Sequence, residues 1–338
     1  MTSALVLRRA GPGLTLQDGG RTGFFAQGIS PGGAVDRLAL IEAAALLGVE
    51  PGDAVLEMAG FGGLFEATGD MRVALTGAPM RASLNGEPLE WNACHRLREG
   101  DALDIGAAQA GIFGYLALGG GIDVANVMGS RSTHLLAGIG RRLGEGDRLD
   151  AGSDPRPERT GLRLEPAARF AGGTVRLIEG PQTRLFDSGT RERFIATAFR
   201  RDPRGNRQGA RLLFDGEPFR VAGQLDIVSE IITAGDVQIA GDGSPFVLMP
   251  ECQTIGGYPR IASVVPDDLA IVAQAAPGTV LRFEFIDAAA ALDDYRRRRT
   301  AGHDLAGRVR PLVRDPASIP DLLGYQLISG ATAGEDLR

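Results

Sequence analysis

The chain has 338 residues, of which 43% are hydrophobic and 23% charged, and its formal net charge is -6. This length and composition predict a globular protein of two or three domains and argue against nucleic-acid binding, because the chain is acidic and its one long basic run is Arg296–Arg299. No apolar stretch approaches the roughly 18 residues that cross a bilayer, so we expect no membrane contact and a cytoplasmic location.

The absence of lysine is the most informative feature of the composition. All 36 basic residues are arginine. The chain therefore lacks the lysine that contacts nucleotide phosphates in a P-loop, forms Schiff bases or carries biotin. We expect no cofactor on this chain, so that any ATP or carrier chemistry belongs to a partner chain. Arginine binds carboxylates and phosphates, so recognition of an anionic ligand by this chain remains possible.

Cysteine and histidine are scarce. The 2 cysteines and 3 histidines are scattered along the chain, so we predict no metal site. Cys252 could act as a nucleophile only with a nearby base, and no cysteine-protease signature surrounds it.

Residues 1–150 are expected to form a first β unit. Near its start, glycines surround Asp18 and Arg21, and a carboxylate and a guanidinium among glycines form either a polar turn or a ligand cradle. Apolar residues then recur with helical spacing, and Gly48 is a typical C-terminal stop. We predict a helix at about residues 36–47.

A second β unit is expected at residues 174–286, because four stretches of the first unit are echoed there in the same order. Short strands joined by Asn-Gly or Asp-Gly turns explain the echoes, and closing such sheets into barrels removes exposed edges. The fold class is therefore mostly β with a few helices, in two related barrel units. The echoed pairs are Val73–Pro79 with Val175–Pro181, Leu84–Leu89 with Phe214–Phe219, Gly100–Ile105 with Gly235–Ala240, and Tyr115–Gly121 with the run leading to Gly256-Gly257.

The remaining segments connect and follow the two units. Residues 151–173, rich in Pro, Arg and Gly, are expected to be a linker. Within the second unit we predict helices at 189–197 and 267–276. Residues 287–338 are expected to hold a helix at 288–299 and a polar tail, in which the apolar stretch Leu322–Ile328 can dock.

The stretch Glu251–Arg260 follows an apolar run and combines a glycine pair, a proline and several polar side chains. We call it the elbow. It is either a tight hairpin at the rim of the second unit or a ligand-binding segment, and the pattern alone does not decide between them.

Four stretches, in this order, resemble the biotin-dependent carboxyltransferase family, whose members include allophanate hydrolase subunit 2, the C subunit of 5-oxoprolinase and the carboxyltransferase part of urea amidolyase. The resemblance runs from about Leu5 to Phe285 and implies cyclophilin-like β-barrels. The stretches are Leu14–Arg21, Leu118–Ile122, Gly129–Thr133 and Gln253–Pro259.

The resemblance also implies a function. The leading hypothesis is the non-ATP-binding subunit of an ATP-hydrolysing 5-oxoprolinase-like complex, which opens 5-oxoproline to glutamate. Its partners would be a sister cyclophilin-like subunit, similar to the B subunit of 5-oxoprolinase, and a third protein similar to the A subunit. One alternative is a carboxyltransferase moving carboxyl from carboxybiotin to urea or a similar amide. The other is a regulatory binding subunit paired with a sister chain.

Three places depart from the family's usual residues. Gly32 replaces a serine, His134 stands where aspartate is usual, and Glu251-Cys252 replace Asp-Arg. If the lost groups contact substrate, the substrate differs from the family's commonest one.

Both leading reactions need preorganised N–H donors and a cation for an oxyanion, together with a base. The candidate catalytic residues are Asp18, Asp36 and Arg21, and Glu57 and Glu230 are further candidate bases. A salt bridge is the competing interpretation for each carboxylate. No histidine base accompanies the serines, which argues against a serine hydrolase triad. The candidate substrate-binding residues are Gly120, Gly121, Ser130, Arg131, Arg207, Gln253, Thr254, Gly256, Gly257 and Tyr258.

Overall fold

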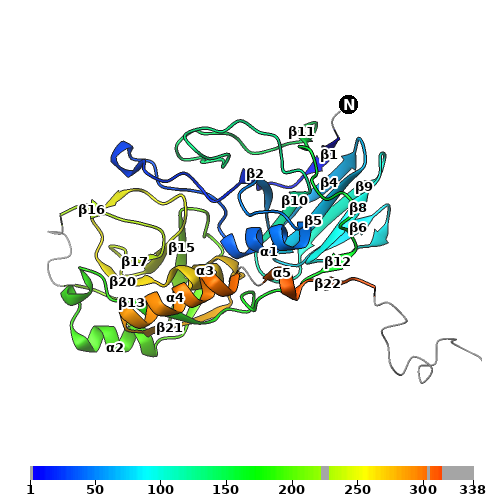
Figure 1. Cartoon of the computed structure of the whole chain (residues 1–338). Helices are drawn as coiled ribbons and strands as arrows, with labels where there is room; N and C mark the ends of the chain where they lie inside the picture. Colours follow the sequence, from blue (N-terminus) through cyan, green and yellow to red (C-terminus); the bar gives the residue numbers. More distant parts are fainter. Residues whose placement is uncertain (1–2, 222–227, 303–304, 314–338) are drawn as a thin grey trace, which may run out of the picture.

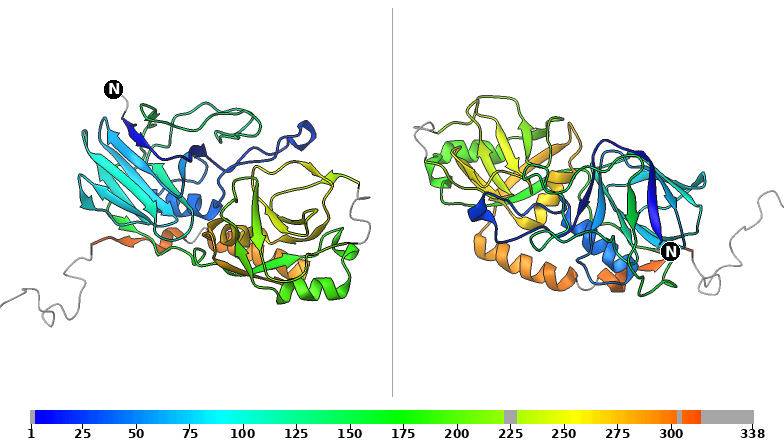
Figure 2. Two further views of the ribbon diagram at one scale, coloured as in Figure 1. Left: turned by 180° about the vertical axis from the view of Figure 1, so that it is seen from behind. Right: turned by 90° about the horizontal axis from the view of Figure 1, so that it is seen from above.

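The computed structural model describes residues 3–221, 228–302 and 305–313. Two β units lie side by side, as Figure 1 and both views of Figure 2 show. The prediction of a mostly β fold with a few helices is confirmed. The apolar stretch Leu322–Ile328 lies outside the described residues.

The first unit consists of two sheets that enclose a core of aliphatic side chains, among them Leu5, Leu75 and Leu116. Strand pairing gives two sheets here, whereas the second unit closes into a barrel. One sheet has the order β11 (Arg148–Asp150), β1 (Ala4–Ala10), β4 (Gly63–Ala67), β9 (Ala102–Ala108), β6 (Met80–Leu84), β7 (Glu87–Pro88). The other has the order β2 (Leu14–Gln17), β3 (Val55–Ala59), β10 (Phe113–Leu118), β5 (Met71–Gly77), β8 (Ala93–Leu97), β12 (Leu162–Arg163), β22 (Arg310–Pro311).

The second unit is a closed barrel of seven strands. Five phenylalanines of this unit pack together in contacting pairs whose ring centroids lie 4.8–6.0 Å apart, which is within the range where aromatic pairs attract. They are Phe194, Phe199, Phe214, Phe219 and Phe283. The strand order is β13 (Gly173–Ile178), β20 (Arg260–Val264), β17 (Asp236–Ile239), β18 (Pro245–Leu248), β15 (Gly209–Leu213), β14 (Phe199–Arg201), β21 (Val280–Phe285).

Helix α1 (Arg37–Leu47) confirms the predicted helix and lies between the two units in both figures. The Asp36 side chain caps its N-terminus by accepting from the backbone N–H of Ala39, and Gly48 ends it with a φ of 69°. Buried apolar side chains of the helix, such as Leu46, belong to one core cluster with residues of the barrel, such as Phe199. The helix therefore joins the cores of the two units.

The segment expected to be a linker is packed on the first unit. Its strand β12 pairs with β8, Leu162 opposite Cys94, and β12 in turn pairs with β22 near the end of the described chain. The chain therefore returns to the first unit after completing the barrel, by way of α4 (Ala288–Gly302) and α5 (Leu305–Arg308).

The other predicted helices are present with shifted ends. They are α2 (Ser188–Ala196) and a 3-10 turn, η4 (Pro266–Asp268), which continues into α3 (Leu269–Gln274). Two other 3-10 turns in the described residues are η1 (Phe25–Gln27) and η2 (Thr183–Leu185).

The turn glycines support the internal repeat. Gly86 and its counterpart Gly216 both have positive φ, and so do Gly100 and its counterpart Gly235. A conformation that L side chains rarely adopt thus recurs at equivalent turns of both units.

Candidate functional site

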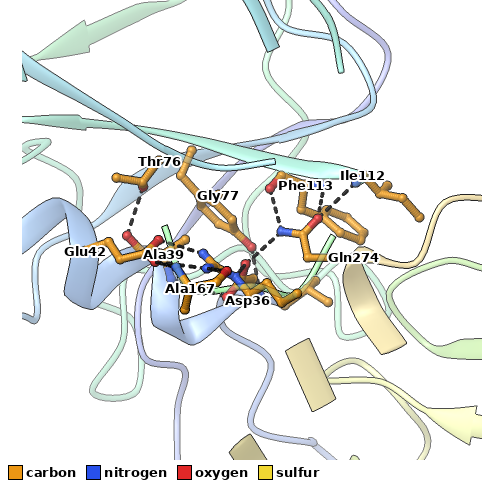
Figure 3. Close-up of polar contacts among 12 residues, drawn as sticks. Asp36, Ala39, Glu42, Thr76, Gly77, Ile112, Phe113, Ala167 and Gln274 are labelled. Carbon is orange, nitrogen blue, oxygen red and sulfur yellow. Dashed lines mark hydrogen bonds and ion pairs between the residues drawn. The ribbon is translucent and has the colours of Figure 1, made fainter. Parts of the chain in front are cut away.

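A buried polar network joins the two units beside α1. All three nitrogens of the Arg169 guanidinium donate to carboxylates there: Nε to Asp36 at 2.6 Å, and Nη1 and Nη2 to the two oxygens of Glu42 at 2.9 and 2.6 Å. Gln274 of α3 donates to Asp36 at 2.8 Å, and its amide oxygen accepts the backbone N–H groups of Ile112 and Phe113. Figure 3 shows Gln274 reaching from the barrel to β10. The predicted catalytic Asp36 is thus fully engaged in holding the units together.

A second chain of contacts continues across the junction from Asp36. The hydroxyl of Tyr115 accepts the Asp36 backbone N–H and donates to Glu57 at 2.8 Å. Glu57 also pairs with the Arg207 guanidinium from the barrel, which bonds Glu251 at 2.6 Å as well. The Tyr115 hydroxyl has its pKa raised well above its usual value, chiefly by burial. Tyr115 therefore stays protonated and acts as a donor.

Asp18 is held by four hydrogen-bond donors. Its carboxylate accepts the hydroxyls of Ser130 and Ser132 and the backbone N–H groups of Gly20 and Arg131. These bonds stabilise the charged form, and they lower the pKa of the carboxyl although burial opposes them. A carboxylate of lowered pKa with four donors is a weak base, and its visible role is to hold the loop at residues 130–132.

Arg21 lies under this loop with 1% of its surface exposed. One terminal nitrogen, Nη2, donates to the Ser132 carbonyl at 2.5 Å. The other two nitrogens, Nε and Nη1, are buried and contact no acceptor among the described residues. Burial lowers the pKa of this guanidinium, while the charges of Asp18 and Glu251 oppose that shift.

His134 and Ser30 form a buried pair next to Arg21. The His134 Nδ1 accepts the backbone N–H of Ala137 at 3.2 Å, so its Nε2 carries the proton and donates to Ser30 Oγ at 3.0 Å. Burial lowers the pKa of His134, so the ring is uncharged at neutral pH. A histidine with this tautomer cannot take the proton of Ser30.

The positions that depart from the family pattern lie together. A Cβ atom placed on Gly32 would be 3.1 Å from the His134 ring, and Gly32 donates its N–H to the Pro250 carbonyl next to Glu251. His134 also feels the charge of Glu251. The three departures therefore belong to one region of the junction.

The glycine triad Gly119–Gly121 and the elbow lie outside the contacts described so far. Gly119 and Gly120 line an open groove of about 480 Å³ together with Arg131, so Arg131 links this groove to Asp18. Gly121, at φ 72°, packs against Asp53. The elbow contributes β19 (Ile255–Gly256), which pairs with β16 (Glu230–Ile231), while Gln253 and Tyr258 are exposed. The glycine triad, Gly119–Gly121, and the elbow thus differ in structure. Gly120 packs on the backbone of Gly152, whereas the elbow supplies one strand of a two-stranded sheet.

Among the predicted site residues, the structure brings Asp18, Ser130 and Arg131 into direct contact. Arg21 donates to the carbonyl of the neighbouring Ser132, and Arg207 donates to the Gly33 carbonyl. Gly120 lies at the groove. Asp36 lies in the junction network. Thr254 is buried and its carbonyl accepts the N–H of Ile232, while Gly256, Gly257, Gln253 and Tyr258 belong to the elbow.

Within the described residues, no group of three or more His, Cys, Asp or Glu side chains could hold a metal ion. Burial raises the pKa of Cys252 to about 12, so the thiol is protonated and inert at neutral pH. Within the same ranges, no helix has the length and apolarity to cross a membrane.

The model of the family described as carboxyltransferase domain, subdomain A and B, matches residues 27–285. The chain belongs to this family. The matched range contains α1, most of the first unit and the whole barrel, so the carboxyltransferase domain includes the junction described above.

Two bacterial relatives are similar to this carboxyltransferase domain over most of their length. The chain is 35% identical to the C subunit of 5-oxoprolinase from Escherichia coli (strain K12), over 82% of this chain and 90% of that protein. It is 31% identical to the C subunit of 5-oxoprolinase from Haemophilus influenzae, over 80% and 88%. Urea amidolyase of Lachancea kluyveri is 27% identical over 80% of this chain but only 16% of that protein.

Solved structures agree on the fold. The crystal structure of TTHA0988 is 31% identical with a TM-score of 0.76, and the match covers 84% of this chain and 56% of that one. The chain thus spans little more than half of TTHA0988. Urea amidolyase of K. lactis has a TM-score of 0.81 over 93% of this chain and 21% of that one, at 22% identity, which shows the shared fold alone.

Ser30, His134, Glu251, Tyr115 and Arg169 were not predicted as site residues. Ser30 and His134 are 104 positions apart in the sequence, and Arg169 lies in the expected linker. Of these five residues, only His134 and Glu251 were marked in the sequence, as departures from the family's usual residues.

Proposed function

We propose that this chain is the non-ATP-binding subunit of a 5-oxoprolinase-like complex that opens 5-oxoproline to glutamate. In this reaction water adds across the lactam C–N bond, giving a carboxylate and an amine, and ATP is hydrolysed to ADP and phosphate. The observation that carries the proposal is the similarity to the C subunit of 5-oxoprolinase over 90% of that relative's length. The absence of lysine fits a subunit that leaves ATP to another chain.

The structure suggests a role for each engaged carboxylate. We propose that Asp18 positions the loop at Ser130–Ser132 and that Asp36 fixes the two units, since the oxygens of both accept several donors. The general base would then be supplied elsewhere in the complex. Arg21, with two buried nitrogens that find no acceptor among the described residues, is the group of this chain best suited to contact a substrate.

An exposed apolar pair on the barrel fits a partner subunit. Ile231 and Ile255 lie directly opposite each other in the β16–β19 ladder, and they are 68% and 59% exposed. Tyr258 adds a third apolar surface, at 52% exposure. We propose that a sister subunit docks here, because the bacterial relatives are named as subunits and TTHA0988 extends well beyond the matched part.

Reconstitution tests the function. The chain is purified with its neighbouring subunits, and conversion of 5-oxoproline to glutamate is measured with and without it. We expect activity only when this chain is present. Full activity of the other subunits alone would refute the proposal.

The elbow is tested in the same assay. Gly257→Val is expected to abolish activity while the purified chain keeps its far-UV circular dichroism. Unchanged activity would leave Gln253, Thr254, Gly256 and Tyr258 as parts of a turn only.

A carboxyltransferase acting on carboxybiotin is the second candidate, favoured by the family match and the urea amidolyase relative. Avidin sequesters biotin and would inhibit such a reaction in the reconstituted complex. Activity that is insensitive to avidin excludes it.

A further inference from the structure

A groove on the first unit has room for a small ligand. Its volume is about 480 Å³, and sites for small molecules measure roughly 300–1,000 Å³. A second hollow of about 380 Å³ adjoins it, because Gly119, Gly120 and Ser153 line both. The larger groove is lined by residues 49–53 of the loop after α1, by Gly119 and Gly120, and by Arg131, Ser153 and Pro155.

The charged side chains of the smaller hollow are paired with one another. Arg72 contacts Asp154 at 2.6 Å, and Arg96 contacts Asp70 at 2.6 Å. These are all the charged residues that line this hollow in the described chain. The smaller hollow therefore leaves no charge of its lining without a partner.

Arg131, in the larger groove, uses only part of its hydrogen-bonding capacity. Its backbone N–H donates to Asp18, and its Nε donates to the Val124 carbonyl at 3.3 Å. These two bonds fix the base and the middle of the side chain. The terminal nitrogens Nη1 and Nη2 bond no acceptor among the described residues, and the side chain is only half-buried. The guanidinium therefore has a free pair of donors, which suits the two oxygens of a carboxylate.

Two carboxylates line the same groove without a cation. Glu50 and Asp53 are exposed, and neither forms an ion pair with a side chain in the described ranges. Asp53 lies against the glycine triad, since a Cβ on Gly121 would be 2.8 Å from its Cγ. The N–H of Gly120 also bonds no acceptor within the described part of the chain. One open space thus holds a free cation, two free carboxylates and a free backbone donor.

The arrangement of these charges decides which ligand fits. An anion is attracted by Arg131 but repelled by Glu50 and Asp53, and an amine attracted by the carboxylates leaves Arg131 without an acceptor. A ligand that carries both a carboxylate and an ammonium group is attracted at both places. The opposite charges of the groove do not contact one another, so a small ligand between them satisfies both.

We propose that this groove binds a small amino acid in its zwitterionic form. Nη1 and Nη2 of Arg131 donate to the carboxylate of the ligand, and its ammonium group donates to Asp53. Glu50 adds to the attraction for the ammonium group. Both contacts stay open to water, so each contributes modestly and the dissociation constant falls in the millimolar range. The site requires no reaction, so the proposal is independent of the proposed function.

Titration of the full chain with matched small molecules tests the proposal. L-alanine and β-alanine carry both charges at different spacings, propionate carries only the carboxylate, and ethylammonium only the ammonium group. The readout is the backbone ¹H–¹⁵N resonances of Gly52, Gly119 and Gly120, which line the groove, in a chain labelled with ¹⁵N-glycine. Gly209 of the barrel is the internal control. We expect a saturable shift of the groove resonances with at least one of the two amino acids, at an affinity about fivefold or more above that of either singly charged probe.

Variants that remove one charge at a time identify the contacts. Arg131→Gln and Asp53→Asn should each weaken amino-acid binding by about fivefold. Arg131→Gln keeps the backbone N–H that donates to Asp18, so the loop at residues 130–132 retains that bond. The matched controls are Arg142→Gln and Glu99→Gln, because Arg142 and Glu99 are exposed residues of the first unit that do not line the groove. Both controls should bind as the unmodified chain does.

Three results overturn the proposal. The first is the lack of a saturable shift of the groove resonances with both amino acids. The second is a shift with propionate or ethylammonium of the same affinity, which would mean that only one charge is recognised. The third is unchanged binding in both Arg131→Gln and Asp53→Asn. The first two results come from the unmodified chain, so they hold even if a variant folds poorly.

Discussion

Replacement of Arg169 by methionine would remove the cation at the centre of the junction. Its guanidinium lies 2.6 Å from oxygens of both Asp36 and Glu42, and all three side chains are at most 2% exposed. Two opposite unit charges whose centres are 4 Å apart attract each other by about 4 kcal/mol if the effective dielectric constant is near 20. Removing one partner of a buried ion pair typically costs about 3–5 kcal/mol. We expect Arg169→Met to lower the free energy of unfolding by about 4 kcal/mol near neutral pH.

The loss should shrink in acid. Burial already raises the pKa of Glu42, and loss of the arginine raises it further. A carboxyl whose folded-state pKa lies above its unfolded value adds stability at low pH, and this contribution disappears as the pH rises through the folded-state value. Glu42 of the variant therefore binds a proton in the folded state when the solution is moderately acidic.

Urea unfolding followed by circular dichroism at about pH 8 and about pH 5.5 measures both effects. Arg163→Met, an exposed arginine of the same segment, is the control and should change stability by no more than about 0.5 kcal/mol. A loss below about 1 kcal/mol for Arg169→Met at the higher pH, or a loss that grows in acid, would refute the reasoning.

Three further predictions concern the site and the surface. His134 has a lowered folded-state pKa, so its contribution to stability is present above about pH 6.5 and is lost as the pH falls. His134→Gln should therefore make the free energy of unfolding, measured in urea, depend less on pH. An unchanged pH dependence would contradict this prediction. Gly120→Ala would place a Cβ 2.0 Å from the Gly152 carbonyl oxygen and should cost about 2 kcal/mol or more, whereas Gly144→Ala, with open space around it, should cost under about 1 kcal/mol in the same experiment. Ile231→Glu with Ile255→Glu should leave thermal unfolding nearly unchanged while abolishing co-purification with the sister subunit; an intact complex would exclude this surface as the interface.

Local signals made α1 predictable from the sequence. Asp36 and Gly48 bracket it, and both act within one turn of the helix, so residue types close in sequence determine its ends. The repeat was visible for the same reason, because each Asn-Gly or Asp-Gly turn needs a glycine at positive φ.

The site was less predictable because its contacts are long-range. Asp36 contacts Gln274 across 238 positions, and Ser30 contacts His134 across 104. No local pattern encodes such pairs; they depend on how the two units pack. Asp18 and Arg21 were found from their glycine-rich surroundings. The sequence could not show that hydroxyls occupy the Asp18 carboxylate, nor that two nitrogens of Arg21 find no acceptor among the described residues.

The pairing of β22 with β12 affects how the chain folds as it leaves the ribosome. Residues 310–311 form the last strand of a sheet whose other strands lie between residues 14 and 163. The edge of that sheet at β12 therefore stays unpaired until residue 311 has been synthesised. The barrel strands, at residues 173–285, are synthesised before β22, so β12 is still exposed while they leave the ribosome. A free edge can pair with another nascent chain, which makes this edge the place where misassembly is expected first.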